Sequence, residues 1–166
     1  MRPHTSKTSC RDAVPSAVAL DDAGFSTLER QCLQVMRLYF SSFAEPQASG
    51  WVGAIDYARM SFSAERAMDL AGAILDTVQA MRTSRRSVFN FSNPLCKHCA
   101  KLLAPAERHL ISTVHCLRAG KSDEAGVHAM LLCEGNPSER FLTVAGRLGH
   151  LLDAEERLGA MAPAER

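Results

Sequence analysis

The sequence lacks any apolar run near the roughly 18 residues that a membrane-spanning helix needs. The apolar stretch near its start, Ala13 to Leu20, is interrupted by Pro15 and is at most a weak secretory signal. An excess of one charge is also missing, because 19 Lys and Arg stand against 18 Asp and Glu. This balance gives no global field that would favour nucleic acid, an acidic membrane surface or an acidic substrate. We therefore expect no membrane association.

Short motifs of common enzyme classes are missing as well. There is no glycine-rich phosphate loop, no Gly-x-Ser-x-Gly turn, no His-Glu-x-x-His motif and no pair of carboxylates usefully spaced from a histidine. Cys99 can be paired on paper with His98 or His109, but nearness in sequence does not make a catalytic pair. The sequence therefore favours a protein that is not an enzyme.

Composition and cysteine spacing indicate one globular domain in a reducing compartment. Hydrophobic residues make up 46% of the 166-residue chain and charged residues 22%, which suits a domain with a core of its own. The six cysteines are spread out, with Cys10 and Cys32 far from the other four. Small disulfide scaffolds are shorter and denser in cysteine. The spacing predicts reduced cysteines in a bacterial-type cytoplasm.

Apolar periodicity predicts an all-α bundle of five or six short to medium helices. Residues 1–23 show no period and are expected to form a disordered tail, ahead of a single domain at 24–158 and a frayed tail at 159–166. Ser26 and Glu29 have the spacing of a capping box before a helix at 27–43, whose apolar stripe includes Cys32. A short amphipathic segment around Trp51 follows, with the tryptophan expected in the core. Ser63 is the expected N-cap of a helix to Arg82.

Residues typical of helix starts and stops predict three further helices in a C-terminal unit at 94–152 that includes a helical hairpin. They are expected at 105–119, 123–134 and 137–152, the last with a fraying extension towards Leu158. Pro105 suits a first helical position, whereas Gly120 and Gly135 suit helix stops. The segment 127–133 is apolar nearly all round, so we expect it to be buried.

Cysteine and histidine residues concentrate in this C-terminal unit. In an antiparallel hairpin, Cys133 would lie level with His109 at the open end, where the Cys96-Lys97-His98-Cys99 motif enters. The sequence therefore predicts a structural zinc held by Cys96, Cys99, His109 and Cys133, with Cys116 as the alternative ligand. Plain structural thiols and a redox-active cysteine pair remain as competing interpretations.

A basic cluster, Arg82, Arg85 and Arg86, ends the helix that begins near Ser63. Cations are expected at a helix C-terminus, where they complement the dipole. The functional alternative is a site for an anion or an acidic partner. A helix-turn-helix reader of DNA is not expected, because the would-be recognition helix opens with Asp123 and Glu124 and is otherwise apolar.

From Arg85-Arg86 through the cysteine pair to Leu131-Leu132, the chain resembles uncharacterised small helical proteins of alphaproteobacteria with a cysteine pair before a helical hairpin. The resemblance covers residues 27–152 and implies no activity, and the roles given to His109 and Cys133 do not come from it. The residues themselves predict a non-enzymatic regulatory or adaptor protein that binds another protein through a helical face, with self-association left open. The alternative is a thiol-based redox or metal sensor that uses Cys96 and Cys99.

Overall fold

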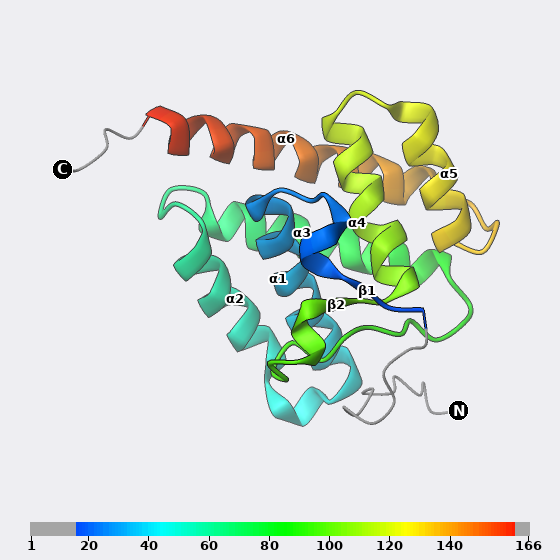
Figure 1. Cartoon of the computed structure of the whole chain (residues 1–166), viewed down its shortest axis with the longest axis horizontal. Coiled ribbons are helices and arrows are strands. Elements are labelled where there is room, and N and C mark those ends of the chain that lie inside the picture. Colours follow the sequence, from blue (N-terminus) through cyan, green and yellow to red (C-terminus); the bar gives the residue numbers. More distant parts are fainter. Residues whose placement is uncertain (1–15, 162–166) are drawn as a thin grey trace.

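The computed structural model describes residues 16–161 and confirms the all-α bundle. Six α-helices account for most of these residues (Figure 1): α1 (Thr27–Ala44), α2 (Gly50–Ser61), α3 (Ala67–Ser84), α4 (Pro105–Arg118), α5 (Ser122–Leu132) and α6 (Glu139–Met161). Three 3-10 turns, η1 (Leu20–Ala23), η2 (Pro46–Ala48) and η3 (Cys99–Lys101), and two short strands, β1 (Val18–Ala19) and β2 (Leu102–Leu103), complete the fold.

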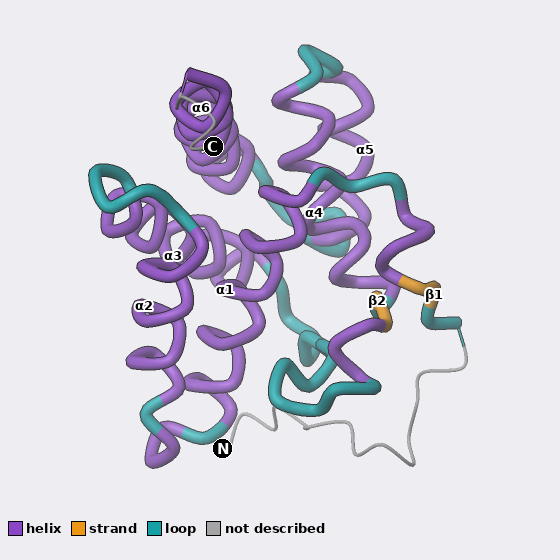
Figure 2. Tube along the Cα trace, turned by 60° about the vertical axis from the view of Figure 1, so that its left-hand side comes forward, coloured by secondary structure: helices purple, strands orange, loops and turns teal. Residues whose placement is uncertain are grey.

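The helices form two groups that α6 joins. Helices α1, α2 and α3 pack on one another, and α4 pairs with α5 as the predicted hairpin. Figure 2 shows the hairpin on the opposite side of the molecule from α2. The long helix α6 packs against both α3 and α4. One continuous hydrophobic core therefore extends through both groups.

Both predicted tails are shorter than expected. Val18 pairs with Leu103, and Ala19 with Leu102, in an antiparallel ladder, and η1 follows directly. The disordered tail is therefore wrong for residues 18–23, because these backbone pairs join segments far apart in sequence; residues 1–15 lie outside the described range. At the other end α6 continues to Met161, so residues 159–161 are helical and 162–166 lie outside the description.

The start of α1 agrees with its sequence signal. The Ser26 amide donates to Glu29 Oε2 at 2.8 Å, and the Glu29 amide donates to Ser26 Oγ at 3.2 Å, which completes the capping box. Cys32 is fully buried, as its stripe predicted. Helix α2 then packs closely on α1 at Gly50, where an added Cβ would lie 2.9 Å from both Leu38 O and Ser42 N. Only glycine fits this approach.

Two predictions around α2 are wrong. Trp51 is 54% exposed, because α2 meets its neighbours through the small buried residues Ala54 and Ala58. Helix α3 begins at Ala67 rather than at Ser63, which lies in a turn instead of capping the helix. The Ser63 amide and hydroxyl both donate to the carboxylate of Glu155 on α6, at 2.6 and 2.7 Å. This contact fixes the α2–α3 connection to α6.

Helix α5 is less buried than its composition predicted. Its inward stripe consists of Ala125, Ala129 and Leu132, which are buried. On the opposite side, Val127, Met130 and Leu131 are exposed by 53, 52 and 52%. The prediction of burial all round is wrong because α5 packs mainly on α4 and only lightly on α6, so one face of this short helix stays uncovered by the rest of residues 16–161.

A buried ion pair ties α1 to α4. Arg37 Nε and Nη2 donate to the two carboxylate oxygens of Glu107 at 2.6 and 2.9 Å. The remaining bonds of the pair go to the backbone: Arg37 donates to Ala100 O and Leu102 O, and Glu107 accepts from the amides of Ser92 and Ala104. The pair thereby holds the connection between α3 and α4 in place, as buried charges require.

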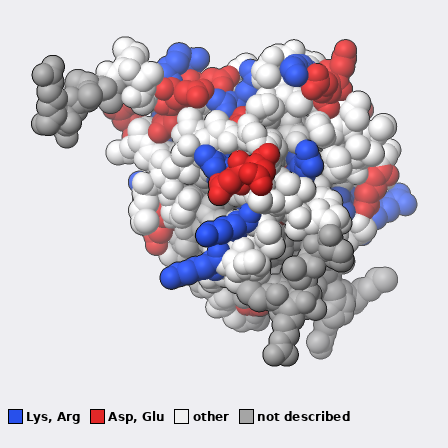
Figure 3. Space-filling view, in the orientation of Figure 1, with Lys and Arg blue, Asp and Glu red and all other residues white. Residues whose placement is uncertain are grey.

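The described surface carries both charges. Lysine and arginine side chains alternate with aspartate and glutamate over the face in Figure 3, without a broad area of one sign. Within residues 16–161, no helix is long and apolar enough to cross a bilayer.

Candidate functional site

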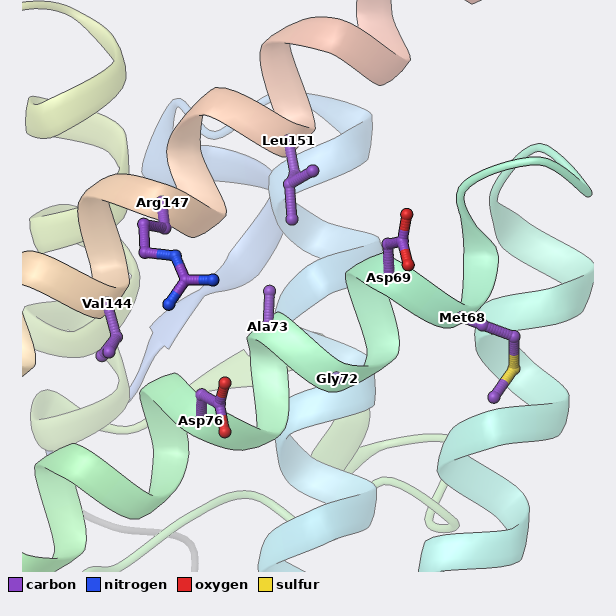
Figure 4. Close-up of a pocket in the computed structure, with 8 residues that line it drawn as sticks. All are labelled: Met68, Asp69, Gly72, Ala73, Asp76, Val144, Arg147 and Leu151. Atoms are coloured by element: carbon purple, nitrogen blue, oxygen red, sulfur yellow. The ribbon is translucent and has the colours of Figure 1, made fainter.

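A groove of about 390 Å³ lies between α3 and α6. Figure 4 shows its walls, one formed by α3 and the other by α6. The lining residues are Met68, Asp69, Gly72, Ala73 and Asp76 from α3, and Val144, Arg147 and Leu151 from α6. Its volume falls within the range of small-molecule sites.

Small residues on the α3 wall leave room for this groove. Residues 68, 69, 72, 73 and 76 recur at steps of three and four, which puts them on one face of α3. In the middle of that face, Gly72 has no side chain, and a Cβ added there would meet nothing within 4 Å. The groove is therefore a consequence of Gly72 and Ala73 opposite the longer side chains of α6.

The charged groups of the groove have no partner in the described chain. Asp69 and Asp76 are exposed and form neither an ion pair nor a side-chain hydrogen bond among residues 16–161. Arg147 extends from α6 into the groove in Figure 4, and it likewise forms no ion pair within these residues. The groove thus combines apolar walls with two carboxylates and one guanidinium open to an outside ligand.

The predicted zinc ligands lie in different surroundings. His109 Nδ1 lies 3.0 Å from Nδ1 of His128 on α5, not beside Cys133. Cys133 is fully buried and interacts with Ser84 and Arg85 at the end of α3. The alternative ligand, Cys116, points to Glu124, with its sulfur 3.9 Å from the carboxylate.

The cysteine pair itself lies in a turn. The Cys99 amide donates to the Cys96 sulfur at 3.4 Å, and the Ala100 amide donates to Cys96 O. In the part of the chain that the structure describes, no group of three or more His, Cys, Asp or Glu side chains is arranged to hold a metal ion. The structure does not assemble the four-ligand site, and zinc at the cysteine pair stays a prediction.

The direction of each side chain around its helix explains why His109 and Cys133 are not neighbours. Counting from the turn gives the height of a residue along the hairpin but not the direction of its side chain. His128 is half-buried and meets His109 on α4, whereas Cys133 is the C-cap residue of α5 and lies beside the end of α3. Burial raises the pKa of the Cys133 thiol and also that of Cys116, which keeps both protonated at neutral pH.

Most of the predicted basic cluster is engaged within the protein. The Arg82 guanidinium lies 3.8 Å from the centre of the Phe43 ring and donates to Gln79. Arg85 donates to Leu132 O and forms an ion pair with Glu134 at 3.2 Å. Arg86 is exposed. These contacts favour a structural role for Arg82 and Arg85, and an anion site at this cluster stays a prediction.

Sequence reasoning missed a second polar cluster, centred on Glu29. Its buried carboxylate lies 3.0 Å from His115 Nδ1 and 2.8 Å from Arg118 Nη1. Arg118 also pairs with Asp153 and Glu156 on α6, each at 2.7 Å. The cluster borders a depression of about 410 Å³. No spacing in the sequence reveals it, because its members come from α1, α4 and α6, and its charges largely satisfy one another.

Comparison with protein families, with curated proteins and with solved structures gives no match to this chain. The resemblance to alphaproteobacterial helical proteins therefore stays a prediction, and any functional argument rests on geometry and charge.

Proposed function

We propose that this protein is a non-enzymatic adaptor that binds an amphipathic, basic helix of another protein in the α3–α6 groove. The observation that supports this proposal is a pair of carboxylates, Asp69 and Asp76, that have no partner within residues 16–161 and lie beside apolar walls with a glycine at their centre. Grooves that combine an apolar floor with charged edges are a recurring way to hold a partner helix.

The charges define the chemistry of the occupant. Asp69 and Asp76 are two helical turns apart on one face of α3, a separation of about 10 Å at 1.5 Å per residue. A bound helix with Lys or Arg at matching two-turn spacing would neutralise both carboxylates. An acidic residue on its other edge would reach Arg147. Between them, an apolar stripe would contact Ala73, Val144 and Leu151.

Contacts outside the groove hold its two walls in place. On the side of α3, the Tyr39 hydroxyl donates to Ala71 O at 3.1 Å from within the core. On the side of α6, Glu155 binds the turn that precedes α3. Because a preformed groove needs little ordering when a ligand binds, this rigidity favours affinity for a helical partner.

The test fills the groove without disturbing the fold. Gly72→Leu places a side chain in open space inside the groove, and Gly146→Leu places the same side chain in open space on a part of α6 that does not line it. The probe is a fluorescein-labelled helical peptide of Leu, Ala and Lys with lysines two turns apart, followed by fluorescence anisotropy.

We expect the probe to bind the wild-type protein and Gly146→Leu equally well, and to bind Gly72→Leu at least tenfold more weakly. A peptide with glutamate in place of lysine should not bind. Equal binding of the probe to both leucine variants, or no binding to the wild type, would contradict the proposal.

A second candidate function is thiol-based redox sensing at the cysteine pair, in a reducing compartment such as a bacterial cytoplasm. The hydrogen bond from the Cys99 amide to the Cys96 sulfur supports it, because such a donor stabilises a thiolate when one forms. In this scheme the Cys96 thiolate attacks glutathione disulfide and releases one glutathione. Cys99 then displaces the second glutathione as a Cys96–Cys99 disulfide forms.

This alternative has its own test. Incubation with glutathione disulfide should lower the protein mass by two hydrogens and release two glutathiones per chain, and Cys96→Ser should abolish both changes. Cys32→Ser, at a fully buried thiol, serves as the control and should leave them intact. An unchanged mass in the wild type would remove this candidate and leave the groove proposal unaffected.

A further inference from the structure

Two histidines from different helices meet nitrogen to nitrogen across the α4–α5 hairpin. The Nδ1 atoms of His109 and His128 are 3.0 Å apart, whereas the ring centres are 5.3 Å apart with a 45° tilt. Both residues are half-buried. At this distance one Nδ1 carries a hydrogen and donates it, and the other offers its lone pair. The contact therefore exists only while one of the two Nδ1 atoms is unprotonated.

The two rings can take up one proton between them without breaking this contact, but not two. Each neutral imidazole has one protonated and one free nitrogen. A first proton can bind the free Nε2 of the donor ring, which leaves the hydrogen bond in place and gives it a charged donor. In the acceptor ring the only free nitrogen is Nδ1, which already accepts the hydrogen bond. A second proton would therefore bring two N–H groups head-on and two positive charges into contact.

The charged groups around the pair do not offset this repulsion. Burial lowers the pKa of His109, and the His128 ring and the Arg108 guanidinium lower it further. On α5, Glu124 precedes His128 by one helical turn, but its carboxylate forms an ion pair with Lys121 at 3.3 Å. Within residues 16–161, no carboxylate forms an ion pair with either ring. A doubly charged pair would thus have no counter-ion in this part of the chain.

Helix α5 depends on α4 for its place in the fold. It packs mainly on α4 and only lightly on α6. Its inward stripe is short and consists of Ala125, Ala129 and Leu132. Elements with few buried contacts are the ones that open locally while the rest of a protein stays folded. A repulsion between α4 and α5 therefore acts on the one extensive interface that holds α5.

We infer that the His109–His128 pair is a pH-sensitive contact that releases α5 from α4 when both rings are protonated. In an opened hairpin both rings can take up protons near the ordinary histidine pKa of 6.5, whereas the closed hairpin keeps one ring neutral. The opened state therefore binds more protons below this pH. The closed hairpin is fully stabilised above pH 6.5 and loses stability as the pH falls below it.

The experiment is hydrogen exchange followed by mass spectrometry, on the full chain at pH 7 and pH 5. Exchange rates of the α5 amides, relative to the intrinsic rate at each pH, give the equilibrium constant for opening. In the wild type this constant should rise roughly tenfold or more between pH 7 and pH 5. His109→Leu leaves one ring free to take up its proton, so the rise should be less than about threefold. His150→Gln, at an exposed histidine on α6, is the matched control and should respond like the wild type.

Nitrogen NMR of the imidazole rings tests the same contact without any substitution. In the closed hairpin at pH 5, one ring of the pair should keep an unprotonated Nδ1, although an ordinary histidine then carries hydrogen on both nitrogens. Two fully protonated rings while the α5 amides stay protected would overturn the inference. An equal rise in opening for the wild type and His109→Leu, or a rise that is lost in His150→Gln, would overturn it as well. None of these results bears on the α3–α6 groove.

Discussion

Arg37 and Glu107 form a bidentate ion pair between helices α1 and α4, with N–O distances of 2.6 and 2.9 Å. Both side chains are almost fully buried. Both side chains also form hydrogen bonds with the backbone of the segment that leads into α4. The pair therefore organises the long connection between α3 and α4 as well as the two helices.

Removing one member of this pair should strongly destabilise the protein. Glu107→Ala leaves the buried Arg37 guanidinium without its counter-charge, and it leaves Arg37 Nε and the amides of Ser92 and Ala104 without their acceptor. Breaking a buried pair in this way costs about 3–5 kcal/mol. Urea unfolding should show this loss, whereas Glu65→Ala, at an exposed position, should change the free energy of unfolding by less than about 0.5 kcal/mol. Similar midpoints for the two variants would show that the pair contributes little.

Two glycines should respond to alanine in opposite directions. At Gly50 the new methyl group would press on the backbone of α1 at 2.9 Å, and such overpacking costs about 1–3 kcal/mol. At Gly72 the methyl group enters open space on a helix, where alanine is favoured over glycine by up to about 1 kcal/mol. Urea midpoints of Gly50→Ala and Gly72→Ala should therefore move down and up, respectively. If the urea midpoint of Gly50→Ala also moved up, the close approach of α1 and α2 at this glycine would not be needed.

Glu134 should make stability depend on pH. The Ser87 hydroxyl and then the amides of Arg86 and Ser87 donate to its carboxylate and lower its pKa to about 2. In the unfolded chain this carboxylate takes up a proton near its ordinary value of 4.5. The unfolded state therefore binds more protons between these values, so the stabilisation is complete above pH 5 and is lost as the pH falls towards 2.

The measurement compares the wild type with Glu134→Gln by urea unfolding from pH 7 to pH 2. The wild type should be the more stable at pH 7, and the difference should shrink steadily below pH 5. Glu139→Gln, at another exposed glutamate, controls for general charge effects. A difference that stays constant over this range would mean that the carboxylate is not held by these donors.

The charge of the groove should set the salt dependence of peptide binding. Exposed ion pairs contribute about 0.2–1 kcal/mol each. The double variant Asp69→Asn with Asp76→Asn should therefore bind the Lys-containing probe roughly 2- to 30-fold more weakly. The effect should diminish at high salt, where exposed charges are screened. Asp56→Asn removes another exposed carboxylate, on α2 and outside the groove, and should have no effect. Anisotropy titrations at two salt concentrations would distinguish these outcomes.

Local signals in the sequence predicted the parts of the fold that depend on neighbouring residues. Residue spacing and helix start and stop residues were enough to predict the Ser26–Glu29 capping box, the buried Cys32 and the helices of the hairpin. Ser63 shows where this reasoning fails. A serine before an apolar stripe has the pattern of an N-cap, but its hydrogen bonds go to Glu155, a residue 92 positions away. Such partners are set by packing, which periodicity does not encode.

The candidate sites were harder to predict than the helices. Counting from the turn correctly gave a hairpin but paired His109 with Cys133, because direction around a helix was left out; the observed neighbour is His128. The groove had no sequence signal as a site, because a glycine within a helix does not show whether a neighbouring helix packs against it. The groove also depends on where α6 lies, because α6 supplies its second wall.

The most direct test of the adaptor proposal is to locate the bound peptide by NMR. In ¹⁵N-labelled protein, addition of the Lys-containing probe should shift the backbone amides around Ala73 on α3 and Val144 on α6, and leave those of the exposed α5 residues Met130 and Leu131 unchanged. Shifts confined to α5, or to the cluster around Glu29, would contradict the proposal and place binding elsewhere on the protein.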